Sequence, residues 1–269
     1  MSEHPHGTAG AAWLRCFRTR PDSTARLVCF AHAGGAASAF RTWPRRLPDG
    51  IELHAVQYPG RQDRAGEPHI DDMEAMADAA AAALRPLLDR PMALLGHSMG
   101  AAIAYEVLRR LEDDPDTTCA HLFVSGHPAP DLRRPGSLHQ GGDAGLIEDV
   151  RRLGAIPPEA LDNPTLRELF LPTLRADYRL IERYVPTAGA PVRTPITVLM
   201  GEDDPEVTRP EALAWSDTTS GAFVLRSFPG GHFYLTTHET QVVDAVTETL
   251  TGAAGRSSTA LHGGRGLTR

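Results

Sequence analysis

The stretch that decides the fold spans residues 91–114 and reads "PMALLGHSMGAAIAYEVLRRLEDD". An apolar run ends at Gly96, Ser98 stands between Gly96 and Gly100, and a helical pattern follows. This order predicts a buried strand, a sharp turn and a helix. In a G-x-S-x-G turn the serine adopts a strained conformation that only small flanking residues permit. Its hydroxyl then lies near a helix N-terminus, where negative charge is favoured, so we interpret Ser98 as a nucleophile rather than an ordinary turn serine.

Five further apolar runs have the character of buried strands. They occupy residues 26–30, 51–58, 121–126, 196–201 and 222–228. Near-continuous runs of valine, leucine and isoleucine are typical of parallel strands that are buried on both faces. Helical patterns fall between the runs, and such alternation favours right-handed strand–helix–strand units. The sequence therefore predicts an α/β fold with a mostly parallel, doubly wound sheet.

One segment, residues 129–188, interrupts this alternation and contains no predicted strand. Its helical patterns occupy residues 143–154 and 163–185. We expect Asn163 to cap the second helix, with Pro164 at its first position, and Pro172 to break or kink it. A stretch of about 60 residues is too long for a simple loop. We interpret it as a helical lid over a substrate site; the alternative is a structural subdomain packed on the sheet.

The chain thus divides into a core, an insertion and two tails. The core comprises residues 12–128 and 189–251, and the insertion comprises residues 129–188. Residues 1–11 and 252–269 are expected to be flexible tails, because the terminal stretch is rich in Gly, Ser, Ala and Arg. The last helix is expected to end near Gly252.

Composition narrows the functional classes. The 269-residue chain has a formal net charge of −7, which argues against a nucleic-acid partner and does not favour a membrane surface. No apolar run approaches membrane-spanning length, and the first residues lack the features of a signal peptide. Three widely spaced cysteines without a CxxC motif suggest reduced thiols in a cytoplasm. The motifs of nucleotide, zinc and calcium sites are missing, so neither a cofactor nor a metal is expected.

A nucleophilic serine needs a base and an acid, and in this type of fold they follow it in the order acid, then histidine. His232 lies in "PGGHF", directly after the last predicted strand, where the base is expected. The preceding strand ends in Glu202, Asp203 and Asp204. We prefer Asp204, because the extended conformation before Pro205 could direct it toward the histidine, and Asp203 is the alternative. The acid would hold the imidazole tautomer and stabilise the imidazolium.

Two backbone amides are expected to bind the oxyanion that forms during acyl transfer. One belongs to Met99, the residue after the nucleophile. The other lies in the loop "AHAGG" at residues 31–35, where we place it at Ala33, with Gly34 as the alternative. Each such donor typically supplies about 2.7–4 kcal/mol of transition-state stabilisation. His32, in the same loop, is interpreted as structural.

Six stretches together resemble a known family. They are "FAHAGGAASAFRTWPRRLP", "AVQYPGRQDR", "LLGHSMGAAIAYEVLRRLE", "LPTLRADYRLIERY", "GEDDPEV" and "FPGGHFYL". They are similar to the type II thioesterases of polyketide and nonribosomal peptide pathways, over about residues 13–250. The family usually has proline where Ala31 stands, a departure that removes no catalytic group.

This resemblance implies an α/β-hydrolase fold and an activity. The implied site residues are Ser98, Asp204 and His232 as the catalytic triad, with the amides of Ala33 and Met99 as the oxyanion hole. The implied reaction is hydrolysis of acyl thioesters from the phosphopantetheine arm of acyl or peptidyl carrier proteins, which edits stalled or wrongly primed synthases. The alternatives are a serine esterase or lactonase acting on free esters, and a non-catalytic carrier-binding protein on a hydrolase fold. A monomer is expected, since no separate interface pattern stands out.

Arginines raise two further questions. Arg61, in "YPGR", belongs to the family signature. We expect it either to anchor the loop beside the lid or to contact the pantetheine. The alternative is an exposed arginine that does neither. Four arginine pairs could form a basic docking surface for an acidic carrier protein, or could be solvated helix faces. The pairs are 45–46, 109–110, 133–134 and 151–152.

Overall fold

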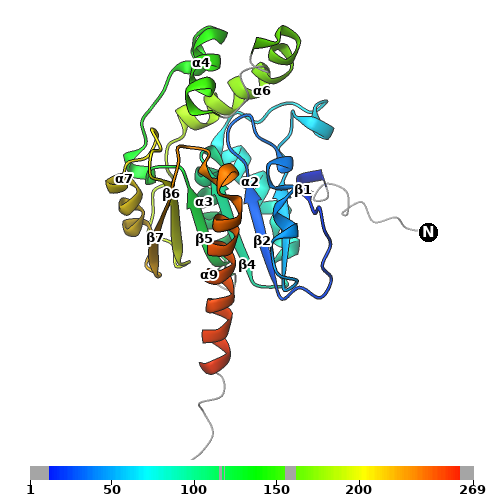
Figure 1. Cartoon of the computed structure of the whole chain (residues 1–269), viewed down its shortest axis with the longest axis vertical. Helices are drawn as coiled ribbons and strands as arrows, with labels where there is room; N and C mark the ends of the chain where they lie inside the picture. The colour runs from blue at the N-terminus through cyan, green and yellow to red at the C-terminus, as the bar shows by residue number, and fades with distance from the viewer. Residues whose placement is uncertain (1–11, 115–116, 118, 155–161, 261–269) are drawn as a thin grey trace, which may run out of the picture.

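The computed structural model describes residues 12–114, 117, 119–154 and 162–260, the last eight of them by their backbone alone. Within these residues a single seven-stranded sheet forms, in the order β1-β3-β2-β4-β5-β6-β7 (Figure 1). The strands are β1 (Leu14–Arg15), β2 (Ala25–Phe30), β3 (Ile51–Val56), β4 (Met92–His97), β5 (Cys119–Ser125), β6 (Ile196–Gly201) and β7 (Phe223–Phe228). β1 is antiparallel to β3, and the other pairs are parallel. The predicted mostly parallel sheet is confirmed, and only β1, too short to leave a sequence pattern, was not expected.

The central strands carry the apolar side chains that a sheet covered on both faces requires. Every residue of β4 is buried, and Leu27 and Phe30 of β2 have no solvent exposure. β7 lies at the edge of the sheet, where Val224 is 45% exposed. Burial of apolar surface stabilises the fold by roughly 25 cal/mol per Å², so the middle of the sheet contributes most.

The parallel strands end at nearly the same level. Phe30 of β2 pairs with Gly96 of β4. On the other side of the sheet, Gly201 of β6 pairs with Phe228 of β7. The loops that follow these strands therefore meet along one edge of the sheet, which is where ligands bind in open α/β folds.

Helices cover both faces of the sheet. α2 (Met73–Leu84) and α3 (Met99–Glu112) lie on one face, and α9 (Glu239–Ala260) lies on the other (Figure 1). Asp72 caps α2 by accepting a hydrogen bond from the Ala75 amide at 2.9 Å. Two shorter helices, α7 (Arg209–Leu213) and α8 (Tyr234–Thr237), follow β6 and β7. The 3-10 helices are η1 (Ala37–Phe40), η2 (Trp43–Arg45), η3 (Gln62–Arg64), η4 (Arg85–Leu87), η5 (Pro130–Leu132), η6 (Leu138–Gln140) and η7 (Ala214–Thr218).

The segment between β5 and β6 contains helices and, in its described residues, no strand, as predicted. α4 (Asp143–Leu153) and α6 (Pro164–Arg183) lie together beyond one end of the sheet, at the top of Figure 1. Asn163 caps α6 by accepting hydrogen bonds from two backbone amides of its first turn. α6 continues through Pro172 and does not break there, because contacts of its second half with the core, described below, compensate for the hydrogen bond that proline cannot make.

α9 ends later than the sequence predicts. Its backbone is helical through Ala260, so it passes Gly252, where the helix was expected to stop. A glycine costs a helix only about 1 kcal/mol relative to alanine, and alanines follow this one at residues 253 and 254. The remaining expected tails, residues 1–11 and 261–269, lie outside the described residues. Among the described helices, none is long and apolar enough to cross a membrane.

Candidate active site

Ser98 occupies the sharp turn between β4 and α3. Its backbone angles are φ 55° and ψ −124°, and a positive φ costs a residue with a side chain about 1–3 kcal/mol. Two hydrogen bonds hold the turn. The Ser98 amide donates to the Ser125 carbonyl at 2.7 Å, and the Ala101 amide donates to the Ser98 carbonyl at 2.8 Å. The conformation is the strained one that the motif predicts, and it presents the serine at the carboxyl edge of the sheet.

The two glycines of the motif are required by space. A Cβ at Gly96 would lie 2.1 Å from the Gly100 carbonyl oxygen. A Cβ at Gly100 would lie 2.2 Å from the Phe30 carbonyl oxygen. The first turn of α3 therefore approaches β2 and β4 more closely than any side chain allows, and this approach places the helix N-terminus beside Ser98.

His232 and Asp204 meet at the neighbouring strand ends. His232 is 2% exposed, and its Nδ1 lies 3.0 Å from both carboxylate oxygens of Asp204. The Asp204 side chain is fully buried, and its Oδ1 also accepts a hydrogen bond from the Glu206 amide at 2.9 Å. Asp203, the alternative acid, is exposed. With the proton on Nδ1 directed at Asp204, Nε2 is the ring atom left to accept a proton.

Three other histidines surround this pair in neutral form. Burial lowers the pKa of His32 and of His127 to about 4 and holds the pKa of His97 well below its usual range. A positive charge on His232 opposes their protonation further. The rings of His97 and His232 are 5.0 Å apart. Because these neighbours stay uncharged, they do not repel an imidazolium that forms at His232.

The two residues whose amides are expected to bind an oxyanion line the same cavity as the serine and the histidine. Ala33 and Met99 both line it. Met99 is the first residue of α3, so its amide has no acceptor within the helix. The alternative donor, the Gly34 amide, is engaged, since it donates to Asp177 at 2.7 Å. Ala33 therefore remains the candidate in this loop.

The cavity that these groups share has a volume of about 310 Å³. The loops after β2, β4, β5 and β7 form one side, and the insertion contributes apolar side chains such as Val150 and Ile181 to the other. The charged side chains in its wall are Arg133, Arg134, Asp149, Arg152, Glu182 and Glu206. Arg134, Asp149, Arg152 and Glu206 form ion pairs with described residues, and Glu182 is hydrogen-bonded to His139, which leaves Arg133. The wall therefore carries one cationic group without a counter-ion among the described residues.

Arg61 is buried, which excludes the exposed alternative. Its guanidinium contacts the carboxylate of Asp177 through two hydrogen bonds of 2.7 Å. Because Asp177 lies in α6, Arg61 anchors its loop to the insertion, one of the two roles that its place in the signature suggested. Asp177 lies within the stretch "LPTLRADYRLIERY" that resembles the family, but the stretch alone does not show that this aspartate meets Arg61.

One group of described residues has the composition of a metal site, and none of its members lines the cavity. Cys16, Glu52 and His54 offer ligand atoms within 4.8 Å of one another. Glu52 is already hydrogen-bonded to the Arg20 amide and to His54, and the Arg26 guanidinium lies 3.9 Å from it. The nearby positive charge opposes cation binding.

Comparison with known proteins relates this geometry to a family. A family model described as a thioesterase domain matches residues 25–250. The thioesterase PikA5 of Streptomyces venezuelae is 37% identical over 251 residues, which cover 93% of this chain and 89% of that protein.

Solved structures of type II thioesterases are also similar to this chain. The type II thioesterase BorB from the borrelidin biosynthetic cluster is 38% identical, with a TM-score of 0.83 over 89% of this chain and 98% of that one. YbtT, the type II thioesterase of the yersiniabactin pathway, is 32% identical, with a TM-score of 0.81 over 90% of this chain and 99% of that one. The chain therefore belongs to the thioesterase family, on the α/β-hydrolase fold that its motifs predict, and its structural neighbours are type II thioesterases of polyketide and nonribosomal peptide pathways.

Proposed function

We propose that this thioesterase hydrolyses acyl thioesters on the phosphopantetheine arm of acyl or peptidyl carrier proteins. It would thereby remove stalled or wrongly primed acyl groups from a polyketide or nonribosomal peptide synthase. The observation that carries the proposal is that four residues line one cavity: the strained Ser98, His232 with its bond to the buried Asp204, and Ala33 and Met99, whose amides would bind the oxyanion. The similarity to type II thioesterases supports a carrier-bound substrate.

The first half of the proposed reaction forms an acyl-enzyme. Ser98 attacks the thioester carbonyl carbon while Nε2 of His232 takes the hydroxyl proton. Asp204 accepts the hydrogen bond from Nδ1 and stabilises the imidazolium. The amides of Ala33 and Met99 bind the oxyanion. The carbon–sulfur bond then breaks, the pantetheine thiol leaves with the proton from the imidazolium, and the acyl group remains on the serine.

The second half releases the acid. Water enters the cavity, gives a proton to His232 and attacks the acyl ester through a second oxyanion on the same two amides. The proton then returns to the Ser98 oxygen as the acid departs. The neutral histidines around the site support this exchange, because they neither compete for the proton nor repel the imidazolium.

We also propose that residues 129–188 act as a lid. In support, the insertion supplies one side of the cavity, including Tyr178 and Ile181 of α6. A subdomain that only stabilised the sheet would not need to face the serine. A volume of about 310 Å³ is at the small end of ligand cavities and favours short acyl groups.

The four arginine pairs that could form a basic docking surface offer few free charges to an acidic carrier protein. Most members of the four arginine pairs are engaged, for instance Arg46 with Glu239 and Arg110 with Asp78. We propose that Arg133, the unpaired cation in the cavity wall, contacts the phosphate of the pantetheine arm, since a guanidinium matches phosphate geometry.

The test uses a carrier protein loaded with a short acyl group. We expect the wild type to release the acid from the carrier and a Ser98→Ala variant to lose at least about 10⁴-fold in rate, as removal of a triad serine does. Release no faster than with Ser98→Ala would refute the proposal.

Kinetics on different substrates and covalent labelling decide between the alternatives. A higher kcat/KM on free esters or lactones than on acyl-carrier thioesters would identify a general esterase. Failure of a fluorophosphonate probe to label Ser98 would identify a non-catalytic carrier-binding protein.

We further propose that the protein works as a monomer in the cytoplasm. Cys16, Cys29 and Cys119 are free thiols, which fits a reducing compartment. Sedimentation analysis checks the oligomeric state, and a stable dimer at micromolar concentration would contradict it.

A further inference from the structure

The ion pair between Arg61 and Asp177 joins three segments that are distant in the chain. Arg61 follows β3, Asp177 lies in the second half of α6, and the turn at residues 32–35 follows β2. Nη1 and Nη2 of Arg61 each lie 2.7 Å from one carboxylate oxygen of Asp177. Arg61 is 6% exposed and Asp177 is fully buried. A buried two-point contact of this kind fixes both side chains in one orientation.

The same two side chains hold the turn at residues 32–35. The Gly34 amide donates to Oδ2 of Asp177 at 2.7 Å. Nη1 of Arg61 donates to the Gly35 carbonyl at 3.0 Å. One donor and one acceptor of the turn are therefore bound by charged partners, which make stronger hydrogen bonds than neutral groups do.

These contacts select one orientation of the central peptide of the turn. The Gly35 amide donates to the His32 carbonyl at 2.9 Å, so the four residues form a β-turn. Gly34, its third residue, has φ 76°, as type II turns require. If the peptide between Ala33 and Gly34 rotated, the Ala33 carbonyl oxygen would face the Asp177 carboxylate, and the two negative groups would repel. Asp177 therefore fixes the orientation of the Ala33–Gly34 peptide, which directly follows the Ala33 amide in the turn.

α6 also packs directly against this region. A Cβ at Gly34 would lie 3.2 Å from Cδ1 of Leu174 in α6. The neighbouring Thr173 donates a hydrogen bond to the Gly60 carbonyl at 3.3 Å. The first half of α6 differs, since Leu169 is 71% exposed. Among the residues that the structure describes, the hydrogen bonds from α6 to the loops of the site begin at Thr173, in the middle of the helix.

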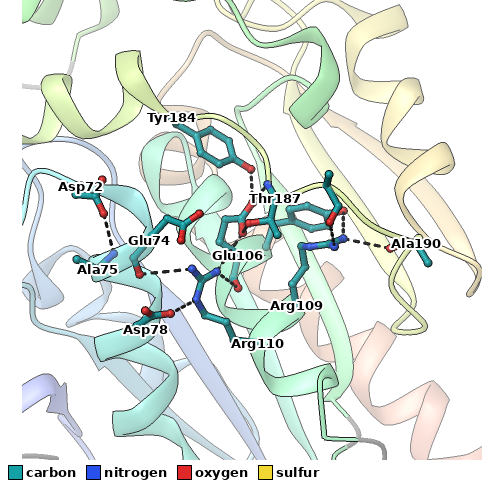
Figure 2. Close-up of polar contacts among 12 residues, drawn as sticks. Asp72, Glu74, Ala75, Asp78, Glu106, Arg109, Arg110, Tyr184, Thr187 and Ala190 are labelled. Carbon is teal, nitrogen blue, oxygen red and sulfur yellow. Dashed lines mark hydrogen bonds and ion pairs between the residues drawn. The ribbon is translucent and has the colours of Figure 1, made fainter.

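The end of α6 is fastened to α3, the helix that begins at Met99. Glu106 of α3 accepts hydrogen bonds from the Tyr184 hydroxyl at 2.8 Å and from the Thr187 hydroxyl at 2.6 Å. Arg109, one helical turn on, donates to the Ala190 carbonyl at 3.1 Å. Figure 2 shows these contacts converging on the segment that leaves the insertion. The helix that holds the Ala33 turn is thus tied to the helix that carries the other proposed oxyanion donor.

From these contacts we propose that Arg61 and Asp177 are positioning residues that hold the oxyanion-binding turn in its active shape and couple it to helix α6 of the insertion. The proposal rests on the proposed function for the role of the Ala33 amide. The insertion would then both close the cavity as a lid and hold the turn that binds the oxyanion. Loss of the pair should slow the chemical step and leave substrate binding nearly unchanged, because neither side chain lines the cavity.

Two variants test the pair. Asp177→Asn retains the shape and an acceptor for the Gly34 amide but loses the charge. The double variant Arg61→Met/Asp177→Leu replaces the buried ion pair by apolar groups of similar size, an exchange that folded proteins often tolerate. We expect kcat to fall about 10-fold in the first and about 100-fold in the second, approaching the loss of one oxyanion donor. KM should change less than about threefold.

A matched control breaks a different ion pair between the insertion and the core. Arg179 of α6 pairs with Asp71 at 2.6 Å, and neither residue contacts the turn at residues 32–35. Asp71→Asn should keep kcat within about twofold of the wild type. On a Ser98→Ala background, acyl-carrier binding should be equal with and without Asp177→Asn, which separates positioning from binding.

The readout includes a p-nitrophenyl ester beside the acyl-carrier thioester. If the wild type prefers the free ester, the proposed function fails, while a loss of kcat in the variants on that ester still supports the positioning role. If the double variant keeps kcat within threefold while its Tm falls, the pair is structural and the inference is wrong. Equal losses in Asp71→Asn and Asp177→Asn would also overturn it.

Discussion

The two turns that supply the proposed oxyanion donors are held by different means. The turn at residues 96–100 depends on the backbone: Ser98 has positive φ, and both flanking glycines lie against carbonyl groups that leave no room for a Cβ. The turn at residues 32–35 depends on side chains, and Asp177, which binds it, comes from a position 143 residues away. The proposed nucleophile is therefore held by the sheet, whereas the turn proposed to bind the oxyanion is held jointly by the core and the insertion.

The largest expected effect tests the sheet-supported half of the site. Asp204→Asn should lower kcat/KM by about 10⁴-fold, because the amide favours the wrong imidazole tautomer and cannot stabilise the imidazolium. Asp203→Asn should stay within about threefold, since Asp203 is exposed and Asp204 alone contacts His232. Steady-state kinetics on one acyl thioester measures both. A greater loss in Asp203→Asn would reassign the acid.

Matched glycine substitutions compare the rigidity of the two turns. Gly100→Ala drives a Cβ to within 2.2 Å of a backbone oxygen, and such overpacking should cost about 3 kcal/mol of unfolding free energy. Gly34→Ala meets only the flexible end of Leu174 at 3.2 Å, so its cost should be the positive-φ penalty of about 1–2 kcal/mol. Urea unfolding measures both changes. Equal destabilisation would mean that the side-chain-supported turn is as rigid as the backbone-supported one.

Acid should destabilise both the turn at residues 32–35 and the sheet-supported part of the site, because each contains a neutral histidine with a lowered pKa. Burial lowers the folded-state pKa of His32 and of His127 from 6.5 to about 4. The unfolded chain therefore binds more protons between these values, and the unfolding free energy should fall as the pH decreases from 6.5 toward 4. Each histidine contributes a slope of about 1 kcal/mol per pH unit.

Single glutamine variants measure how much each histidine contributes to the pH dependence of the unfolding free energy. His32→Gln, in the turn held by α6, and His127→Gln, in the loop after β5, should each flatten the dependence by about that amount. Urea titrations at several pH values measure it. A slope unchanged in His32→Gln would show that the side-chain-supported turn opens to water before the protein unfolds.

The smallest expected effect concerns the mouth of the cavity. Arg133→Ala should raise KM for an acyl-carrier substrate about fivefold, the loss of one charge-assisted hydrogen bond, and leave KM for an acyl cysteamine thioester unchanged. Arg134→Ala is the matched control, because Arg134 is already paired with Glu211. An equal rise with the cysteamine thioester, which lacks the phosphate, would exclude phosphate as the partner of Arg133.

Much of the sheet could be predicted because its parallel strands are near-continuous apolar runs, which can be recognised without reference to the rest of the chain. The expected burial on both faces holds for β2 and β4, whereas in β7, at the edge, only Phe228 is buried. The exceptions have local reasons. β1 has two residues and no pattern to read. Gly252 and Pro172 indicate helix ends by propensity alone, yet both helices continue, since a single unfavourable residue costs less than the turns on either side contribute.

The sequence by itself determined the order of strands and helices, the strained turn at Ser98 and the strand ends on which a base and an acid could stand. All of these depend on residues that are adjacent in the chain. Only the tertiary structure decided that Asp204 meets His232, that the Gly34 amide is engaged, and that Arg61 binds Asp177. The partners in these contacts are 28, 143 and 116 positions apart. Such contacts exist only once the sheet aligns its strand ends and the insertion closes on them, because a side chain's partner is set by packing and not by its neighbours in sequence.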